Sequence, residues 1–174
     1  RAKALEILAE SDISKALALL LLYGCQAQGE LDGEAERPFD RAAAWETAKA
    51  MARPGDPAAV LEFFSGLEIL TDTWRRRLHT PEPGDWDRRT ENLLRYLVNR
   101  YWLQAVSDYD LYGRVKFMVI SAVLLRLLGG DFRETAQLFS KEIENDAENL
   151  DAILDAAYDS PIFTDAKMLG MLLQ

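Results

Sequence analysis

The sequence predicts an all-α protein, a single domain over residues 1–174 built as an irregular bundle of about seven or eight helices around a central helical hairpin at about residues 86–128. Apolar residues recur at the three- and four-residue spacing of a buried helical face through most of the chain. No segment shows the alternation of apolar and polar residues that is typical of a strand, and β-branched residues are sparse. No repeat of fixed period indicates a solenoid.

Short polar side chains mark where the helices of the first half begin, because their oxygens accept hydrogen bonds from the free backbone amides of a first turn. The N-cap candidates are, in order, Ser11 or Asp12, Asp40, Asp56 with Pro57 behind it, and Thr71. Each precedes apolar residues at helical spacing. We therefore expect a helix after each cap, in addition to a helical segment at residues 2–9.

Three segments of the first half interrupt the helical pattern. The stretch at about residues 29–39 is acidic, contains glycine and has no apolar periodicity, so we expect a mobile loop there. Residues 52–57 and 79–85 carry prolines and glycines that leave no room for a helix.

The central hairpin is predicted to hold two helices joined by the turn at residues 107–110. The first helix repeats apolar residues on one face. The second, from Leu111, is apolar nearly all round, so it should lie at the centre of the core. Asp110 stands where its N-cap belongs, and Gly129 is placed to end it.

Two further apolar stripes follow, at residues 132–143 and 150–157, with a break or kink expected near Asn145 and Asp146. Ser160 and Pro161 end the second stripe. Thr164 is the expected cap of a last helix.

Charge is unevenly distributed along the chain, which has a formal net charge of −9. Residues 131–160 hold nine acids and two bases, a net −7, and residues 74–126 hold ten bases and six acids, a net +4. The acidic whole argues against nucleic acid as a partner. The basic excess favours a solvated helical surface over a face for an anionic partner.

The chain has one cysteine, Cys25, and one histidine, His79. An internal disulfide, a Cys₄ or Cys₂His₂ metal site and an iron–sulfur cluster held by this chain alone are therefore excluded. Such cysteine usage fits a reducing compartment, and we expect a cytoplasmic protein. No stretch of 18 apolar residues predicts a membrane span. Phosphate-binding, nucleophile-elbow and dinucleotide motifs are absent, and no residue stands out as catalytic.

Four charged residues gather at the hairpin turn: Asp108, Asp110, Arg114 and Lys116. Asp110 and Arg114 are four apart, a good spacing for an ion pair within a helix. One interpretation is structural, a cap and ion-pair network that fixes the hairpin. The other is a polar pocket that holds part of a ligand or a substrate lysine.

Arg100, in the first helix of the hairpin, is placed to reach Glu142, Glu144 or Asp146 of a later helix. Glu142 also shares a face with Asn145 and Asn149. These groups indicate either salt bridges at the edge of the core or the wall of a polar pocket. The hairpin is also rich in aromatic residues, which form either core or an interface or channel for a lysine side chain. They are Tyr96, Tyr101, Trp102, Tyr109 and Tyr112.

The order of these motifs resembles a known family. The segments ENLL, RYWLQAV, a D-x-D-L step and RVKF before an apolar run, and then AQLFSKEIENDAENLDAIL, are similar to the C-terminal half of the flagellin lysine-N-methylase family over residues 67–154. Members use S-adenosylmethionine and an iron–sulfur cluster, held by a Cys-rich N-terminal segment, to methylate lysines of bacterial flagellin. That Cys-rich segment is not in this sequence, which opens at Arg1 in a helical pattern.

The resemblance implies a C-terminal fragment of a longer lysine N-methyltransferase that shapes the substrate side of the site. It would bind no cofactor and be inactive by itself, and its protein substrate would resemble flagellin. Substrate or cofactor contacts would come from Arg100, Asp108, Asp110, Arg114, Lys116 and Glu142. The alternative is a noncatalytic helical module that binds a protein partner. A face exposed by truncation would be covered by a homodimer or by the lost segment.

Overall fold

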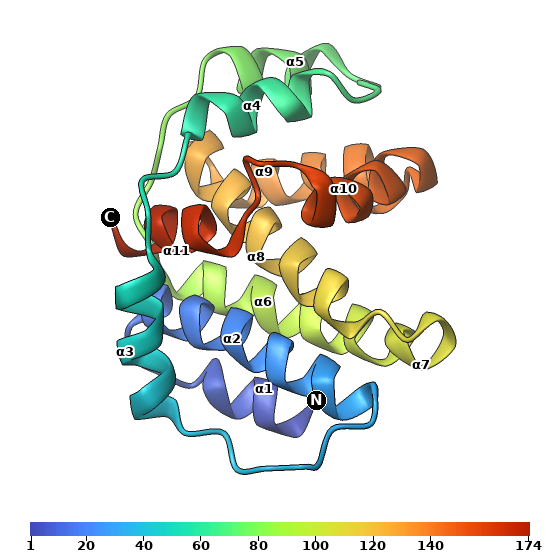
Figure 1. Ribbon diagram of the computed structural model, residues 1–174. Coiled ribbons are helices and arrows are strands. Elements are labelled where there is room, and N and C mark those ends of the chain that lie inside the picture. The colour runs from blue at the N-terminus through green and yellow to red at the C-terminus, as the bar shows by residue number, and fades with distance from the viewer.

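The computed structural model describes residues 1–174 and confirms an all-α protein without strands (Figure 1). The helices are α1 Ala2–Ile7, α2 Ile13–Leu31, α3 Arg41–Met51, α4 Pro57–Ser65, α5 Asp72–His79, α6 Arg88–Tyr101, α7 Ala105–Asp108, α8 Leu111–Leu128, α9 Phe132–Phe139, α10 Ala147–Asp159 and α11 Asp165–Leu173. Nine of them have eight or more residues. The predicted count of about seven or eight helices was too low.

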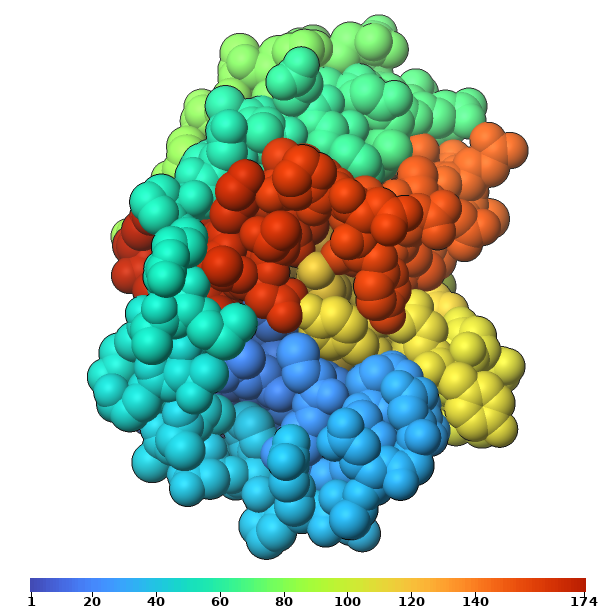
Figure 2. Space-filling model, in the orientation of Figure 1, coloured from blue at the N-terminus to red at the C-terminus, as the bar shows by residue number.

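Helix α8 crosses the middle of the molecule. Helices α4 and α5 lie beyond α9 and α10 at one end, and α1, α2 and α6 lie at the other (Figure 1). Nearly every residue of α8 is buried, as its continuous apolar sequence predicts. In the space-filling view, a hollow between α2 and the α10–α11 segment exposes a small part of α8 (Figure 2). No helix is both long enough and apolar enough to cross a membrane.

The most extensive neighbour of α8 is α2, so the prediction of a core centred on the α6–α8 hairpin was incomplete. Gly24 of α2 lets the two helices approach closely. A Cβ atom built on Gly24 would lie 2.8 Å from Cγ1 of Val115 in α8, closer than side chains pack. Sequence periodicity showed that both helices are apolar but not that they meet each other.

Local capping chemistry sets most helix starts, as predicted. Asp12, Asp40, Asp56, Thr71 and Asp110 each accept a hydrogen bond from a first-turn backbone amide of the helix that follows. Thr164 occupies the N-cap position of α11 but makes no side-chain capping bond. The N-terminal boundaries of these helices could therefore be found from the sequence.

The predicted mobile loop at about residues 29–39 has a different boundary in the structure, because α2 continues to Leu31. The non-helical part folds back on that helix. The backbone amide of Glu34 donates to the carbonyl of Gly29 at 2.9 Å, and the side chain of Gln26 donates to the carbonyl of Arg37 at 2.8 Å. The last turn of α2 is therefore fixed by contacts that lie outside any local helical pattern.

The helix of residues 88–108 changes its pitch twice. A 3₁₀ turn, η1 (Trp102–Gln104), joins α6 to α7, and Tyr109 then adopts a left-handed conformation before α8. The predicted turn at residues 107–110 is thus shortened, since Asp108 still belongs to α7.

The expected break near Asn145 and Asp146 is confirmed. Helix α9 continues into a π-helical turn, η2 (Ser140–Glu144), and Asp146 caps α10. Single π-helical turns are rare and are found frequently at functional sites.

Candidate functional site

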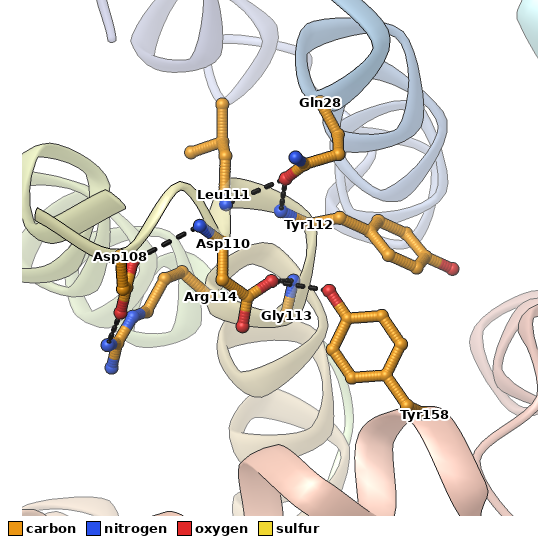
Figure 3. A network of polar contacts seen from close by, with 8 residues as sticks. All are labelled: Gln28, Asp108, Asp110, Leu111, Tyr112, Gly113, Arg114 and Tyr158. Atoms are coloured by element: carbon orange, nitrogen blue, oxygen red, sulfur yellow. Dashed lines mark hydrogen bonds and ion pairs between the residues drawn. The ribbon is translucent and has the colours of Figure 1, made fainter. Parts of the chain in front are cut away.

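The hairpin turn forms a network of helix caps (Figure 3). Asp110 accepts hydrogen bonds from the amide of Gly113 at 2.8 Å and from the hydroxyl of Tyr158. The predicted Asp110–Arg114 ion pair is wrong, because the guanidinium of Arg114 pairs with Asp108 instead. Burial acts to raise the pKa of Asp108, but the bonds from Arg114 and the amide of Asp110 outweigh it and hold that pKa below its usual value.

Gln28 of α2 completes this network and was not found from the sequence. Its Oε1 accepts from the amides of Leu111 and Tyr112 at 2.8 and 2.9 Å, and its Nε2 donates to the carbonyl of Tyr109 at 2.9 Å. The Nε of Arg114 is the one buried polar atom of the network without a partner. Because the other polar groups form hydrogen bonds or ion pairs with one another, we interpret the turn as structural.

Lys116 does not join the turn network. Its ammonium lies 3.4 Å from Asp165 of α11, donates to the carbonyl of Ala157 and faces the ring of Tyr112. The phenol of Tyr112 also donates to Asp165. Lys116 is only 5% exposed, so this cluster ties α8 to α10 and α11 within the core.

Cys25 lies beside the same carboxylate, 3.9 Å from Asp165. The residue reaches the surface. Partial burial of the thiol, followed by the negative charge of Asp165, raises the pKa of Cys25 to about 11. The thiol is therefore protonated at neutral pH, which does not suit a nucleophile.

Glu142 is fully buried, and its carboxylate pairs neither with Arg100 nor with the hairpin turn. Its carboxylate accepts from the amide of Leu70 at 2.7 Å and the hydroxyl of Thr71 at 2.5 Å. Asn149 shares the face, as expected, and bonds to the carbonyl of Glu142. Glu142 therefore holds the start of α5 against the π turn, and it lines none of the five main cavities.

Arg100 forms the predicted interhelical ion pair, with Glu144 rather than with Glu142 or Asp146, at 3.3 Å. The same oxygen of Glu144, Oε1, accepts from the phenols of Tyr96 at 3.0 Å and Tyr101 at 2.9 Å. Burial and the Glu144 charge raise the pKa of Tyr96. These phenols stay protonated and serve as donors to Glu144.

Glu144 closes one end of a groove between the outer faces of α6 and α9, the largest of the well-formed cavities at about 560 Å³. This α6–α9 groove is lined by Arg89, Asn92, Leu93, Tyr96, Asp131, Phe132, Arg133, Ala136, Gln137, Ser140 and Glu144. Leu93, Phe132 and Ala136 give it an apolar part. The π turn η2 places Glu144 at its end.

The second carboxylate oxygen of Glu144, Oε2, makes no hydrogen bond within the chain and reaches the surface, although the side chain as a whole is only 2% exposed. A buried carboxylate with an unused oxygen at the end of a partly apolar groove can bind a cationic group whose stem is apolar. Of the six predicted site residues, only Arg100 contacts this end of the groove, through its pair with Glu144.

The residues of this chain do not fit an iron–sulfur cluster. Cys25 is the only thiol, and no three His, Cys, Asp or Glu side chains lie close enough together to hold a metal ion. We therefore assign no chemical step of such a group to this chain.

Comparisons with protein-family models, curated proteins and solved structures found no match to the chain.

Proposed function

We propose that the chain is the substrate-side helical region of a lysine-N-methylase-like protein, and that the α6–α9 groove binds a lysine side chain of a protein substrate such as flagellin. Helix α6, helix α9 and the turn η2 all lie within residues 67–154, the part that carries the resemblance. The observation that supports the proposal best is the unused Oε2 of buried Glu144.

The groove suits a lysine better than other side chains. The four methylenes of a lysine would lie against Leu93 and Phe132, and its ammonium would donate to Oε2 of Glu144. The phenol of Tyr96 donates to that carboxylate, and the guanidinium of Arg100 lies over the Tyr96 ring. Arg100 offsets part of the attraction, but its side chain is 42% exposed, so solvent screens its charge.

Binding of labelled peptides tests this assignment. We expect a peptide Ala-Ala-Lys-Ala-Ala to bind at least tenfold more tightly than the same peptide with norleucine, because a hydrogen bond to a charged group contributes about 1.5–3 kcal/mol. Glu144→Gln keeps an acceptor for the two phenols and should abolish this difference. The control Glu148→Gln, at an exposed site of α10, should leave it unchanged. Equal affinity of both peptides for the wild-type chain would refute the proposal.

Methyl transfer distinguishes an enzyme from a noncatalytic module that binds lysine. The full-length parent would be purified without oxygen, and its iron content and transfer of labelled methyl groups from S-adenosylmethionine to flagellin would be measured. The presence of iron, together with methyl transfer that Glu144→Gln abolishes, would support the enzyme assignment. Lysine binding without iron or transfer would leave a protein-binding module.

A further inference from the structure

The charge of Glu144 is already partly neutralised within the chain. Nε of Arg100 lies 3.3 Å from Oε1 of Glu144, and it donates to the hydroxyl of Tyr101 at 3.2 Å. The guanidinium also lies over the rings of Tyr96 and Tyr101, 6.0 and 5.5 Å from their centroids. Arg100 is therefore a resident cation beside the carboxylate that the substrate lysine would bind.

No other cation of the groove lies as close to Glu144. Arg89 and Arg133 line the opposite end, near the starts of α6 and α9. Arg89 precedes Tyr96 by seven residues, about 10 Å along the helix at about 1.5 Å per residue, and Arg133 precedes Glu144 by eleven. Salt screens surface charges at such separations, so Arg100 is the cation that acts on this carboxylate.

Methylation needs the neutral amine of lysine, because the ammonium has no lone pair with which to attack a methyl group. A free lysine has a pKa of about 10.4, and a carboxylate beside it favours the charged form still further. Glu144 alone would therefore bind lysine tightly in its unreactive form. A positive charge beside the same carboxylate has the opposite effect, since it repels the ammonium but not the neutral amine, which can still donate a hydrogen bond to Oε2.

We propose that Arg100 is a positioning residue that acts through Glu144 and shifts the α6–α9 groove toward the neutral amine form of its lysine. This inference rests on the proposed function of the groove and extends it, because it assigns to a second residue the control of the ligand's charge. The phenols of Tyr96 and Tyr101 support this role, since they donate to Oε1 at 3.0 and 2.9 Å and leave Oε2 for the ligand.

The size of the effect follows from the distance between the two cations. The guanidinium lies 3.3 Å from Oε1, so an ammonium hydrogen-bonded to Oε2 would lie about 7 Å from it. Repulsion over about 7 Å weakens ammonium binding about threefold at the dielectric constant of water and about fiftyfold at the effective value near a protein surface. The Arg100 side chain is 42% exposed, so we expect the lower part of this range, about three- to tenfold.

A peptide with a neutral donor separates charge from hydrogen bonding. 6-Hydroxynorleucine replaces the ammonium of lysine by a hydroxyl, which donates to Oε2 without a positive charge. The dissociation constants of Ala-Ala-Lys-Ala-Ala and of its hydroxynorleucine analogue would be measured at pH 7 for the wild-type chain and for Arg100→Gln. The preference for lysine over hydroxynorleucine should be about three- to tenfold larger in Arg100→Gln, because the variant binds lysine more tightly and the neutral analogue no more tightly.

Three further substitutions show whether the charge of Arg100 is responsible. Arg100→Lys keeps the positive charge and should keep the wild-type preference, whereas Arg100→Met keeps only an apolar stem and should act like Arg100→Gln. Arg95→Gln is the matched control, because it removes from α6 a positive charge that pairs with Glu91 and does not line the groove. Circular dichroism checks that each variant is folded.

An unchanged preference in Arg100→Gln and Arg100→Met, or an equal rise in Arg95→Gln, would overturn the inference. A rise in Arg100→Lys as large as that in Arg100→Gln would also overturn it, since shape rather than charge would then be responsible. Equal binding of the lysine and norleucine peptides by the wild-type chain would instead refute the proposed function of the groove, and the inference with it.

Discussion

The side chain of Gln28 holds the start of the central helix, and Gln28→Ala tests how much this contributes to stability. The variant leaves the amides of Leu111 and Tyr112 without their acceptor and removes the bond to the carbonyl of Tyr109. At about 1 kcal/mol for each amide and about 0.5 kcal/mol for the donated bond, the free energy of unfolding should fall by about 2.5 kcal/mol. In a chain of this size the melting temperature should fall by about 5–10 °C.

Gln28→Glu separates the contribution of the hydrogen bonds that Gln28 accepts from that of the bonds it donates. The carboxylate of the variant still accepts hydrogen bonds from both amides at the positive end of α8, but it cannot donate to the carbonyl of Tyr109. It also faces the carboxylate of Asp32, which in the wild type accepts a hydrogen bond from Gln28 at 3.0 Å. We expect an intermediate loss of stability, measured by urea unfolding followed by circular dichroism. Gln104→Ala, at an exposed site, is the matched control. A loss below about 0.5 kcal/mol for Gln28→Ala, less than a single hydrogen bond contributes, would show that Gln28 does not stabilise the start of α8.

Three other predictions concern the packing and titration of the fold. Gly24→Ala should destabilise the chain by about 1–3 kcal/mol in urea unfolding, because the new Cβ meets Val115. Adding Val115→Ala to this variant should recover part of the lost stability, and additive losses from the two substitutions would contradict the contact. Alkylation of Cys25 at pH 8 should be slower than that of a free thiol, and Asp165→Asn should speed it by lowering the thiol pKa; an unchanged rate in the variant would contradict the role of that carboxylate. The pKa of Asp12 is lowered chiefly by the hydrogen bond from the amide of Lys15, so the ionised carboxylate stabilises the fold above the unfolded pKa of about 3.9. The difference in unfolding free energy between wild type and Asp12→Asn should therefore shrink as the pH falls below that value.

Much of the fold could be predicted because its determinants are local. The caps at Asp40, Asp56 and Asp110 act on amides three residues away, and the apolar character of α8 alone placed it in the core. The break before Asp146 was also visible as a change in the register of the apolar stripe. Such features need no knowledge of what lies across the molecule.

The candidate site could not be predicted in the same way, because its parts meet through tertiary packing. The pair of Arg100 with a later acidic residue was expected, but only the π turn shows that Glu144 faces the groove and Glu142 faces α5. The two carboxylates are two residues apart along this turn, and they bind different neighbours. The spacing of Asp110 and Arg114 suggested an ion pair, but Asp108 binds Arg114 because Asp110 already caps α8. Tyr96, Arg100 and the candidate partner Glu144 were the sequence signals that pointed toward the groove.

The most direct test of the lysine-binding groove is an amide NMR titration of the ¹⁵N-labelled chain with N-acetyl-lysine methylamide, with the norleucine analogue as the control ligand. The lysine ligand should shift the amides of Leu93, Phe132, Ala136 and Glu144, and Glu144→Gln should remove these shifts while the fold is retained. Shifts of equal size with the norleucine analogue, or shifts confined to residues outside the α6–α9 groove, would contradict it.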